Sequence, residues 1–394
     1  MDDYPVVGII VPAHNAAQWL DECLGSVVGQ TYRGRMLLSV YDDASSDATE
    51  AVLLNWERRL LGAEAGPGRG RVAPRFGGSR WVGRGGRADA VNVGCGGAKN
   101  AAVRQVEGEA ECLCFLDADD AMEPERVERQ VAACRQWPGA IIGARTRRVP
   151  DGSTPHYIEW ANGLSPAELW THAFRETTLL MPTWFMRTQV YDAVGGFNER
   201  RPEEGGEGED LIFFQSHLLQ WAKARAGDLG SGVALWESDP PLVLVGGEPL
   251  VRYRWSEGSG SSKASRRFLI GLRAEAFEAR VLGLHGAWRG GFRIWGSGRD
   301  GRHFLAALSG SARLQVKCFV DVAANAVGQV YINHTLQPPL DPIPIVSCAQ
   351  AEGDPATRGL PCVVCVSLRR HGDEVRRNVA ALNLVEGHTL WFFV

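Results

Sequence analysis

Residues 6–15 read VVGIIVPAHN, an uninterrupted apolar run that ends in a proline, a histidine and an asparagine. Such a run is typical of a strand that is buried on both faces of a sheet. Residues 15–30, NAAQWLDECLGSVVGQ, then place apolar side chains at helical spacing, with Asn15 as a candidate N-cap. The chain therefore begins with a strand followed by a helix, the repeating unit of parallel sheets.

The same alternation continues along the chain. Residues 36–47, MLLSVYDDASSD, and residues 111–122, ECLCFLDADDAM, are apolar strands that end in acids, and an amphipathic helix is expected after each. This order indicates an α/β fold with a mixed, mainly parallel sheet. Residues 292–304, FRIWGSGRDGRHF, begin a second strand–turn–helix unit of the Rossmann type.

The composition divides the chain into parts. We expect an α/β domain over residues 1–262, a basic helical connector over 263–289 and a small Rossmann-like α/β domain over 290–394. Residues 62–97 contain twelve glycines and six arginines against two acids. This composition predicts a flexible insertion within the first domain, because it offers little apolar surface to bury.

Charge and apolar patterning exclude several classes of protein. The net charge of −4 is not that of a general nucleic-acid binder, although residues 252–303 hold eleven Lys and Arg against four acids. No apolar run approaches the roughly 20 residues of a membrane helix, and the first residues lack a basic signal-peptide region. Nine cysteines without regular spacing argue against a disulfide framework. We therefore expect a cytoplasmic protein without a membrane anchor.

Carboxylates gather at the ends of two predicted strands. Asp42 and Asp43 end the second strand, and Asp117, Asp119 and Asp120 follow the strand near residue 116. Ligands of parallel sheets bind at the edge where such strands end. Oxygen ligands at this spacing suit a hard divalent cation, which would neutralise a leaving diphosphate. The alternative is a polar loop that caps the helix near residue 123.

Glu209 and Asp210 form another acidic pair, at the start of a predicted amphipathic helix with the sequence GEDLIFFQSHLLQWAKA. An acid at this position is also an ordinary helix cap. Because the chain already carries a candidate metal–diphosphate site, we interpret Asp210 as a general base that accepts the proton of a hydroxyl group.

In this order, VVGIIVPAHN, VYDDASSD, FLDADD and GEDLIFF resemble the GT-A catalytic domain of family 2 glycosyltransferases, over roughly residues 5–260. The resemblance implies a domain that binds a nucleotide sugar, through Pro12, Ala13, His14, Asn15, Asp42, Asp43, Lys99, Asn100 and, at the ribose, Asp117. It also implies that Asp119, with or without Asp120, binds Mn²⁺ or Mg²⁺. By the same resemblance Asp210 deprotonates the acceptor hydroxyl in an inverting, single-displacement transfer.

The acceptor side of this site is assigned to Trp184, Glu209 and Arg254, of which the tryptophan could stack on a sugar or base. Many family 2 enzymes carry a histidine shortly after a Tyr-Arg pair, whereas Tyr253-Arg254 is followed here by WSEGSGSSK. The resemblance therefore leaves the third metal ligand open, and Arg254 becomes a candidate phosphate contact. The QxxRW signature of processive synthases is missing, which argues against polymer synthesis.

A finer resemblance, to glycosyltransferases that modify queuosine in tRNA, runs through VPAHNAAQWLDECLGSV, FLDADDAMEPERV, IIGARTRRVP, MPTWF, GGFNE and FRIWGSGRDGRHF. It implies transfer of galactose from UDP-galactose to the cyclopentene hydroxyl of queuosine in the anticodon of cytosolic tRNA-Tyr. One alternative is a β-1,3-N-acetylglucosaminyltransferase that uses UDP-GlcNAc and glycan or lipid acceptors. Another is a non-catalytic module that binds nucleotide or tRNA.

The C-terminal part carries a motif of its own. Gly296, Gly298 and Gly301 form GxGxxG, and Asp321 lies twenty residues after the last glycine. This spacing matches the dinucleotide-binding fingerprint. Glycines in such a turn also serve packing alone, and we favour a structural or acceptor-docking module over a cofactor site.

Overall fold

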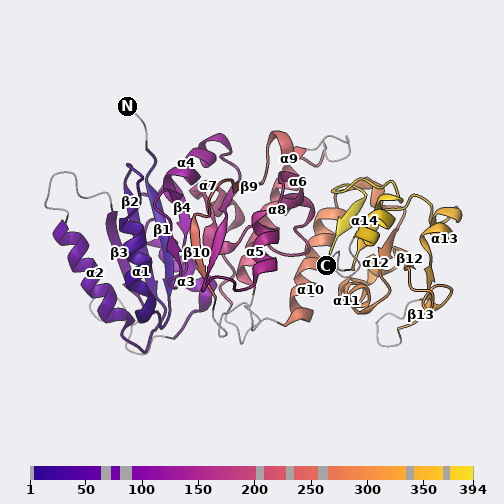
Figure 1. The fold of residues 1–394 in the computed structure, drawn as a ribbon, viewed down its shortest axis with the longest axis horizontal. Helices are drawn as coiled ribbons and strands as arrows, with labels where there is room; N and C mark the ends of the chain where they lie inside the picture. The colour runs from indigo at the N-terminus through magenta and orange to yellow at the C-terminus, as the bar shows by residue number, and fades with distance from the viewer. Residues whose placement is uncertain are drawn as a thin grey trace. The chain divides into compact units, whose positions relative to one another are not determined.

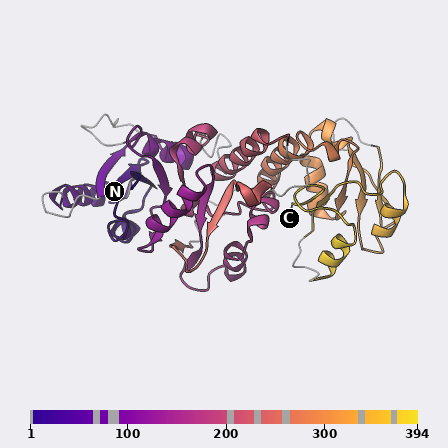
Figure 2. The same cartoon turned by 90° about the horizontal axis from the view of Figure 1, so that it is seen from above.

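The computed structural model describes residues 4–63, 72–79, 91–200, 208–227, 235–255, 265–333, 341–366 and 373–393. The chain divides into two compact units (Figures 1 and 2). Unit 1 comprises Met1–Leu169, Thr178–His217 and Asp239–Lys263, and unit 2 comprises Trp170–Thr177, Leu218–Ser238 and Ala264–Val394. Two segments that we counted with the first domain, residues 170–177 and 218–238, therefore belong to unit 2.

Unit 1 is built on a seven-stranded sheet with the strand order β3-β2-β1-β4-β8-β6-β9. Neighbouring strands are parallel except at β8, which runs antiparallel to β4 and β6. The strands are β1 (Val7–Ala13), β2 (Met36–Asp42), β3 (Val72–Gly78), β4 (Cys112–Phe115), β6 (Ile141–Ala144), β8 (Phe185–Arg187) and β9 (Leu242–Val245). The predicted α/β fold with a mixed, mainly parallel sheet is confirmed.

A second, three-stranded sheet in unit 1 has the order β5-β10-β7, formed by β5 (Ala121–Met122), β10 (Val251–Arg254) and β7 (Thr146–Val149). The helices and helical turns of unit 1 are α1 (Ala17–Val28), α2 (Thr49–Ala63), α3 (Gly94–Arg104), α4 (Arg126–Gln136), α5 (Pro155–Asn162), η1 (Met181–Thr183) and α7 (Thr188–Val194). Helices α6 (Pro166–Thr171) and α8 (Glu209–Ala224) begin in unit 1 and end in unit 2.

Strand β1 is buried on both faces, as its apolar run predicts. Val7, Ile9 and Val11 point into a core that also contains buried side chains of α1, α2 and α4. On the opposite face, a Cβ at Gly8 would lie 3.0 Å from Cγ2 of Val106, just beyond α3. Helices therefore cover both faces of the sheet, which explains why β1 needs no polar residue before its C-terminal end.

The prediction of a flexible insertion over residues 62–97 is wrong for part of that range. Residues 72–78, VAPRFGG, form β3, which pairs with β2 along its whole length, and residues 94–97 begin α3. Ala73 and Phe76 are buried, and Arg75 pairs with Glu109 at 3.0 Å. The prediction failed because it used the average composition of residues 62–97, which does not show that a short stretch within them is apolar enough to form an edge strand. Residues 64–71 and 80–90 lie outside the described part of the chain.

Unit 2 contains a six-stranded sheet with the order β13-β14-β12-β11-β15-β16, parallel throughout except for β13 against β14. Its strands are β11 (Phe292–Trp295), β12 (Val316–Val320), β13 (Val330–Tyr331), β14 (Ile343–Val346), β15 (Cys362–Val364) and β16 (Leu390–Phe392). Numbered along the chain, the five parallel strands stand in the order 3-2-1-4-5 of the Rossmann fold.

The helices of unit 2 include the predicted basic connector. It forms α10 (Arg266–Phe277) and a π-helical turn, η4 (Glu278–Leu282), and buries Ile270, Ala274 and Phe277 in the core. The other helices are α9 (Leu235–Ser238), η5 (Gly286–Trp288), α11 (Arg299–Ala307), α12 (Gly310–Arg313), α13 (Cys348–Gly353) and α14 (Asp373–Ala380). Among the described residues, no helix combines the length and apolar character needed to cross a membrane.

The GxGxxG turn joins β11 to α11. Gly296 has a φ of +103°, and a Cβ at Gly301 would lie 1.9 Å from the carbonyl oxygen of Gly296. Asp321, at the end of β12, accepts hydrogen bonds from the backbone N–H of Ser297 at 2.8 Å and from its hydroxyl at 2.5 Å. Close packing between the helix and the strand thus explains Gly296 and Gly301. Asp321, the acidic residue of the fingerprint, is hydrogen-bonded to the turn itself.

We expect Gly301→Ala to destabilise unit 2 by about 1–3 kcal/mol, because the added methyl group overlaps a backbone oxygen and the turn must move. Gly298→Ala is the matched control, since a Cβ there has no heavy atom within 4 Å and φ is −74°. Urea unfolding of both variants measures the difference. Equal losses of stability would contradict this account of the turn.

Candidate active site

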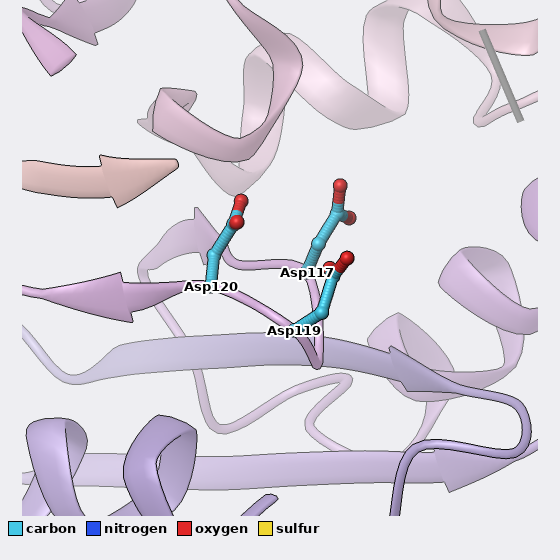
Figure 3. Close-up of side chains that lie close together, drawn as sticks. All are labelled: Asp117, Asp119 and Asp120. Atoms are coloured by element: carbon cyan, nitrogen blue, oxygen red, sulfur yellow. The ribbon is translucent and has the colours of Figure 1, made fainter. Parts of the chain in front are cut away.

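Three carboxylates stand close together where β4 leads into β5. Asp117, Asp119 and Asp120 leave this loop on the same side (Figure 3). Each offers a ligand oxygen, and these oxygens lie within 4.8 Å of one another. The tight turn is closed by a hydrogen bond from the N–H of Asp120 to the carbonyl oxygen of Asp117 at 3.0 Å. The structure therefore brings together the acids that the sequence places after this strand.

Burial is the main cause that raises the pKa of all three carboxyl groups. For Asp117, the positive charge of Lys99 opposes burial. The negative charges of Asp119, Glu209 and Asp210 add to it, and the pKa of Asp117 reaches about 7. Burial and the neighbouring negative charges together make ionisation of Asp117 unfavourable.

The cluster fits a divalent cation. Asp120 is 2% exposed, yet among the described residues its Oδ2 has no hydrogen-bond partner. A buried carboxylate oxygen without a donor is unfavourable unless a cation binds it. With Asp119 and Asp117 beside it, Asp120 could complete an all-oxygen set of the kind that Mg²⁺ or Mn²⁺ prefers. Asp117, which we assigned to the ribose, is thereby also a candidate for the missing third ligand.

Arg254 braces the acidic loop from β10. Its backbone N–H donates to Oδ1 of Asp120 at 2.7 Å, and its Nε donates to the carbonyl oxygen of Asp119 at 2.8 Å. Its Nη2 contacts Glu22 of α1 at 2.6 Å, while the guanidinium lies 4.2 Å from the ring centre of Trp19. Glu22 and Trp19 were not identified from the sequence, although their spacing of three residues places them on one face of α1.

Arg126, at the start of α4, binds the end of β4 just before the same loop. Its guanidinium is fully buried at the start of α4, and it donates to the carbonyl oxygen of Phe115 at 2.8 Å and to Gln130 at 2.9 Å. Burial lowers the pKa of Arg126, and the charges of nearby anionic groups that include Asp120 and Asp117 oppose this effect. The sequence gives little signal for this role, because an arginine in a charged helix is usually exposed.

The ends of β1 and β2 are tied together by side chains predicted to bind the nucleotide. Nδ1 of His14 lies 2.7 Å from the carbonyl oxygen of Asp43. Asn15 has a φ of +52°, and its Oδ1 accepts the N–H of Ser46 at 2.8 Å. Asn15 is therefore not the N-cap of α1 as predicted: that position belongs to Ala16, which makes no side-chain cap. Pro12 and Ala13 end β1 immediately before them.

Both acids at the end of β2 are buried and hydrogen-bonded. Asp43 accepts the backbone N–H groups of Val93 at 2.7 Å and Gly94 at 3.0 Å, at the N-terminus of α3. Burial raises the pKa of Asp43 in spite of these bonds. Oδ1 of Asp42 accepts the N–H of Ser45 at 3.1 Å. In this arrangement, the carboxylate of Asp43 holds the beginning of α3 against the sheet.

Lys99 and Glu209 form a buried ion pair between α3 and α8, with 2.7 Å between Nζ and Oε1. The Lys99 side chain is 1% exposed and its ammonium also lies 5.1 Å from the ring centre of Phe197. Burial by itself lowers the pKa of Lys99, but nearby anionic groups, including Glu209, Asp117 and Asp210, raise it well above its ordinary value. Lys99 therefore stays charged beside the acids.

Asp210 follows Glu209 in the first turn of α8 and is partly exposed. Its Oδ1 accepts the N–H of Leu211 at 2.7 Å. Its negative charge contributes to the raised pKa values of both Asp117 and Lys99, and its neighbour Glu209 forms the ion pair with Lys99. The structure therefore brings the start of α8 to Lys99 and the acidic loop, although Asp210 follows Asp117 by 93 residues in the sequence.

Two predicted site residues lie in the protein core. Asn100 donates to the carbonyl oxygen of Phe197 at 2.9 Å and accepts the hydroxyl of Tyr191 at 2.6 Å, so its amide holds the loop before α8. The prediction that Trp184 contacts the acceptor is wrong: the side chain is fully buried, and its Nε1 donates to the carbonyl oxygen of Leu179 at 2.9 Å. Trp184 packs instead among aromatic rings at Phe197, Phe213 and Phe214.

Residues 8–72 and 88–195 match the family model described as glycosyl transferase family 2. The matched residues are similar to family 2 glycosyltransferases and make up less than half of the chain. They include the ends of β1 and β2, the N-terminus of α3 and the loop with Asp117, Asp119 and Asp120. Asp210 and Arg254 lie beyond the match.

Curated relatives resemble only part of the chain. An uncharacterized glycosyltransferase of Rickettsia typhi is 26% identical over 127 residues, which are 32% of this chain and 31% of that protein. The UDP-Glc:α-D-GlcNAc-diphosphoundecaprenol β-1,3-glucosyltransferase of Escherichia coli is 30% identical over 135 residues, which are 34% of this chain and 42% of that enzyme. The chain thus matches less than half the length of each of these two relatives.

A solved structure with a similar chain path is TarS 1–349 of S. aureus in complex with UDP-GlcNAc. The TM-score is 0.48 at 16% sequence identity, over 69% of this chain and 66% of that chain. GalNAc-T7 with UDP, GalNAc and Mn²⁺ has a TM-score of 0.44 at 13% identity, over 71% and 48% of the two chains.

We expect Asp117→Asn to become more stable relative to the wild type as the pH rises from 5 to 8, with metal removed by EDTA. The pKa of Asp117 is raised to about 7, so the folded wild type must release a proton in this range that the unfolded chain has already lost. The amide removes this cost, which is on the order of 1–3 kcal/mol. Urea unfolding at both pH values measures the effect.

Asp151→Asn is the control, because Asp151 is exposed in a turn away from the cluster. Its stability relative to the wild type should be the same at both pH values. If the difference between Asp117→Asn and the wild type is also constant with pH, the carboxyl group of Asp117 does not carry this electrostatic cost.

Proposed function

We propose that the chain is a UDP-sugar-dependent hexosyltransferase that inverts the anomeric carbon of its donor. One observation carries this proposal: Asp210 follows Glu209, whose carboxylate pairs with Lys99 at 2.7 Å, and the charges of both acids add to the raised pKa of Asp117 in a loop of three acids. A proton acceptor next to a candidate diphosphate site is what single-displacement transfer to a hydroxyl group requires. The family 2 match of residues 8–72 and 88–195 supports the same interpretation.

The donor would lie along the edge formed by the ends of β1, β2 and β4. His14, Asn15 and Asp43 line this edge and are candidates for the uridine, and Asp117 for the ribose. A divalent cation held by Asp119 and Asp120 would supply positive charge to the leaving UDP. Arg254 and Arg126 keep the loop in place for such a cation.

In this proposal, Asp210 accepts the proton of the acceptor hydroxyl group. During transfer the acceptor oxygen bonds to the anomeric carbon, the bond from that carbon to the oxygen of UDP breaks, and the hydroxyl proton passes to the carboxylate of Asp210. Glu209 is engaged by Lys99, and both acids are partly exposed. Glu209 therefore positions the start of α8 in this proposal.

For the finer function, we propose galactose transfer from UDP-galactose to the cyclopentene hydroxyl of queuosine in cytosolic tRNA-Tyr. The sequence motifs that resemble queuosine-modifying glycosyltransferases support it, and so does the excess of basic residues over 252–303. In the described part of this segment, Arg267 is exposed, whereas Arg266 pairs with Asp300 at 2.8 Å.

Nucleoside mass spectrometry tests the reaction. The protein is incubated with Mn²⁺, a panel of UDP-sugars and tRNA from queuine-fed or queuine-starved cells. We expect a hexose increment on queuosine with UDP-galactose and only in the queuine-fed sample. UDP-sugar hydrolysis without transfer to tRNA would favour the glycan or lipid acceptors of a UDP-GlcNAc enzyme, and neither transfer nor hydrolysis would favour a non-catalytic binding module.

We expect Asp210→Asn to lower kcat by about 10²–10⁴-fold, because the amide cannot accept the proton, while the affinity for UDP changes little. Asp192→Asn, an exposed acid on α7, is the matched control and should keep full activity. Steady-state kinetics together with UDP titration calorimetry separate the two effects. An active Asp210→Asn enzyme would remove Asp210 as the base.

We expect Arg267→Glu to raise the KM for tRNA and to lower the slope of binding against salt, without changing the affinity for UDP. Arg58→Glu, an exposed arginine on α2, is the control of equal charge change. Filter binding of tRNA over a series of salt concentrations measures the slope. If the affinity of Arg267→Glu for tRNA equals that of the wild type, Arg267 on α10 does not contact tRNA.

A further inference from the structure

A buried arginine in unit 2 is surrounded by aromatic rings. Arg280 is 1% exposed and lies in the π-helical turn η4. The central carbon of its guanidinium lies 4.0 Å from the ring centre of Phe174, 4.6 Å from that of Trp170 and 5.4 Å from that of Trp391. π-helical turns are rare and frequently occur at functional sites.

In the described part of the chain, several hydrogen-bond donors of this cluster have no acceptor. Among the described residues, Nε, Nη1 and Nη2 of Arg280 all lack a partner, and so do the indole Nε1 atoms of Trp170 and Trp391. His285 is buried against the ring of Trp391, at 6.2 Å between ring centres, and both of its ring nitrogens are also without a partner. Burial is the main cause that lowers the pKa of His285 to about 4, so its ring is neutral at pH 7 and contributes one further N–H.

Within the part of the chain that the structure describes, the charge of Arg280 has no counter-ion. Burial is the one cause resolved for its lowered pKa of about 9, and the guanidinium therefore remains charged at neutral pH. The carboxylates on neighbouring segments are engaged elsewhere: Glu176 binds Arg273 at 2.9 Å, Glu278 accepts the hydroxyl of Ser309 at 2.5 Å, and Glu386 accepts the hydroxyl of Thr171 at 2.6 Å.

Another buried arginine of unit 2 shows the usual arrangement. Arg293 has a fully buried side chain that forms an ion pair with Glu352 and donates to the carbonyl oxygen of Leu360 at 2.6 Å. Buried charges in proteins are normally paired in this way, because an uncompensated ion in the interior is strongly unfavourable. Cation–π contacts with three rings stabilise Arg280 in part, but they leave its N–H groups unsatisfied.

We propose that the guanidinium of Arg280 and the indole N–H groups of Trp170 and Trp391 bind a small monovalent inorganic anion of the halide type. One negative charge neutralises the single positive charge, and a spherical ion accepts hydrogen bonds from several directions. Divalent phosphate or sulfate would leave excess negative charge and would place further acceptor oxygens among aromatic rings. In a cell, the anion of this class is chloride. The site lies within unit 2 and does not depend on the proposed transferase activity.

The full-length protein tests the proposal by thermal unfolding in sodium chloride and in sodium gluconate at equal ionic strength. An anion that binds only the folded state raises the Tm of unit 2 by about 3 °C for each tenfold increase in its concentration above its Kd. We expect this rise in chloride and bromide but not in gluconate. Equal Tm values in the two salts at every concentration would overturn the proposal.

Arg280→Met locates the effect, because methionine fills much of the same space without a charge. We expect this variant to lose the dependence on chloride. Arg293→Met is the matched control: it removes a buried arginine that has a protein partner, and we expect it to lower the Tm while keeping the chloride dependence. Chloride dependence that survives in Arg280→Met would place the anion elsewhere and would refute the assignment.

Crystals soaked in bromide decide the matter if Arg280→Met does not fold. We expect an anomalous peak within hydrogen-bond distance of the Arg280 guanidinium. Absence of a peak there, in crystals that show bromide at other positions, would overturn the proposal independently of any variant.

Discussion

The repulsion between carboxylates at one edge of the sheet is the constraint on which the structure of unit 1 depends. Three acids stand within a few ångströms of one another after β4, and two more begin α8 beside them. The chain holds them there with positive charge and backbone: Lys99 pairs with Glu209, Arg126 binds the carbonyl oxygen of Phe115, and Arg254 binds the loop. Each of these cations comes from a different element, so the surrounding fold is arranged to keep an unfavourable cluster in place.

The sequence predicted where this edge would lie but not how it is held. The apolar runs at residues 6–12 and 112–116 predicted buried parallel strands, and the polar residues that follow them mark the edge because strand ends meet there. Trp184 shows the limit of this reasoning, since an aromatic residue near a motif can equally be core. Arg254 is held in place by contacts with Glu22 and Trp19, which lie more than 230 residues earlier in the chain. The periodicity of the sequence carries no information about a contact between residues so far apart. Residues 72–78 were missed because glycine and arginine on either side dominate the composition.

Unit 2 shows how one motif can be read in two ways. Its parallel strands have the Rossmann order, and its first turn carries the three glycines of a dinucleotide site. In the structure Gly301 is needed because α11 passes close to the carbonyl oxygen of Gly296, and Asp321 binds Ser297. Local packing therefore explains most of the fingerprint. The interior of the same unit also holds Arg280, whose charge has no partner among the described residues, and no sequence pattern predicts this arrangement.

Helix α3 is attached at three points along its length. Asp43 holds its first N–H groups, Lys99 in its middle reaches α8, and Asn100 in the next position holds the loop before α8. A ligand that competes for the oxygens of Asp43 must therefore loosen the beginning of this helix, and the rest of the helix is attached to the segment that carries Asp210. If the proposed function is correct, binding of a nucleotide beside Asp43 and the position of Asp210 are thus thermodynamically linked through α3.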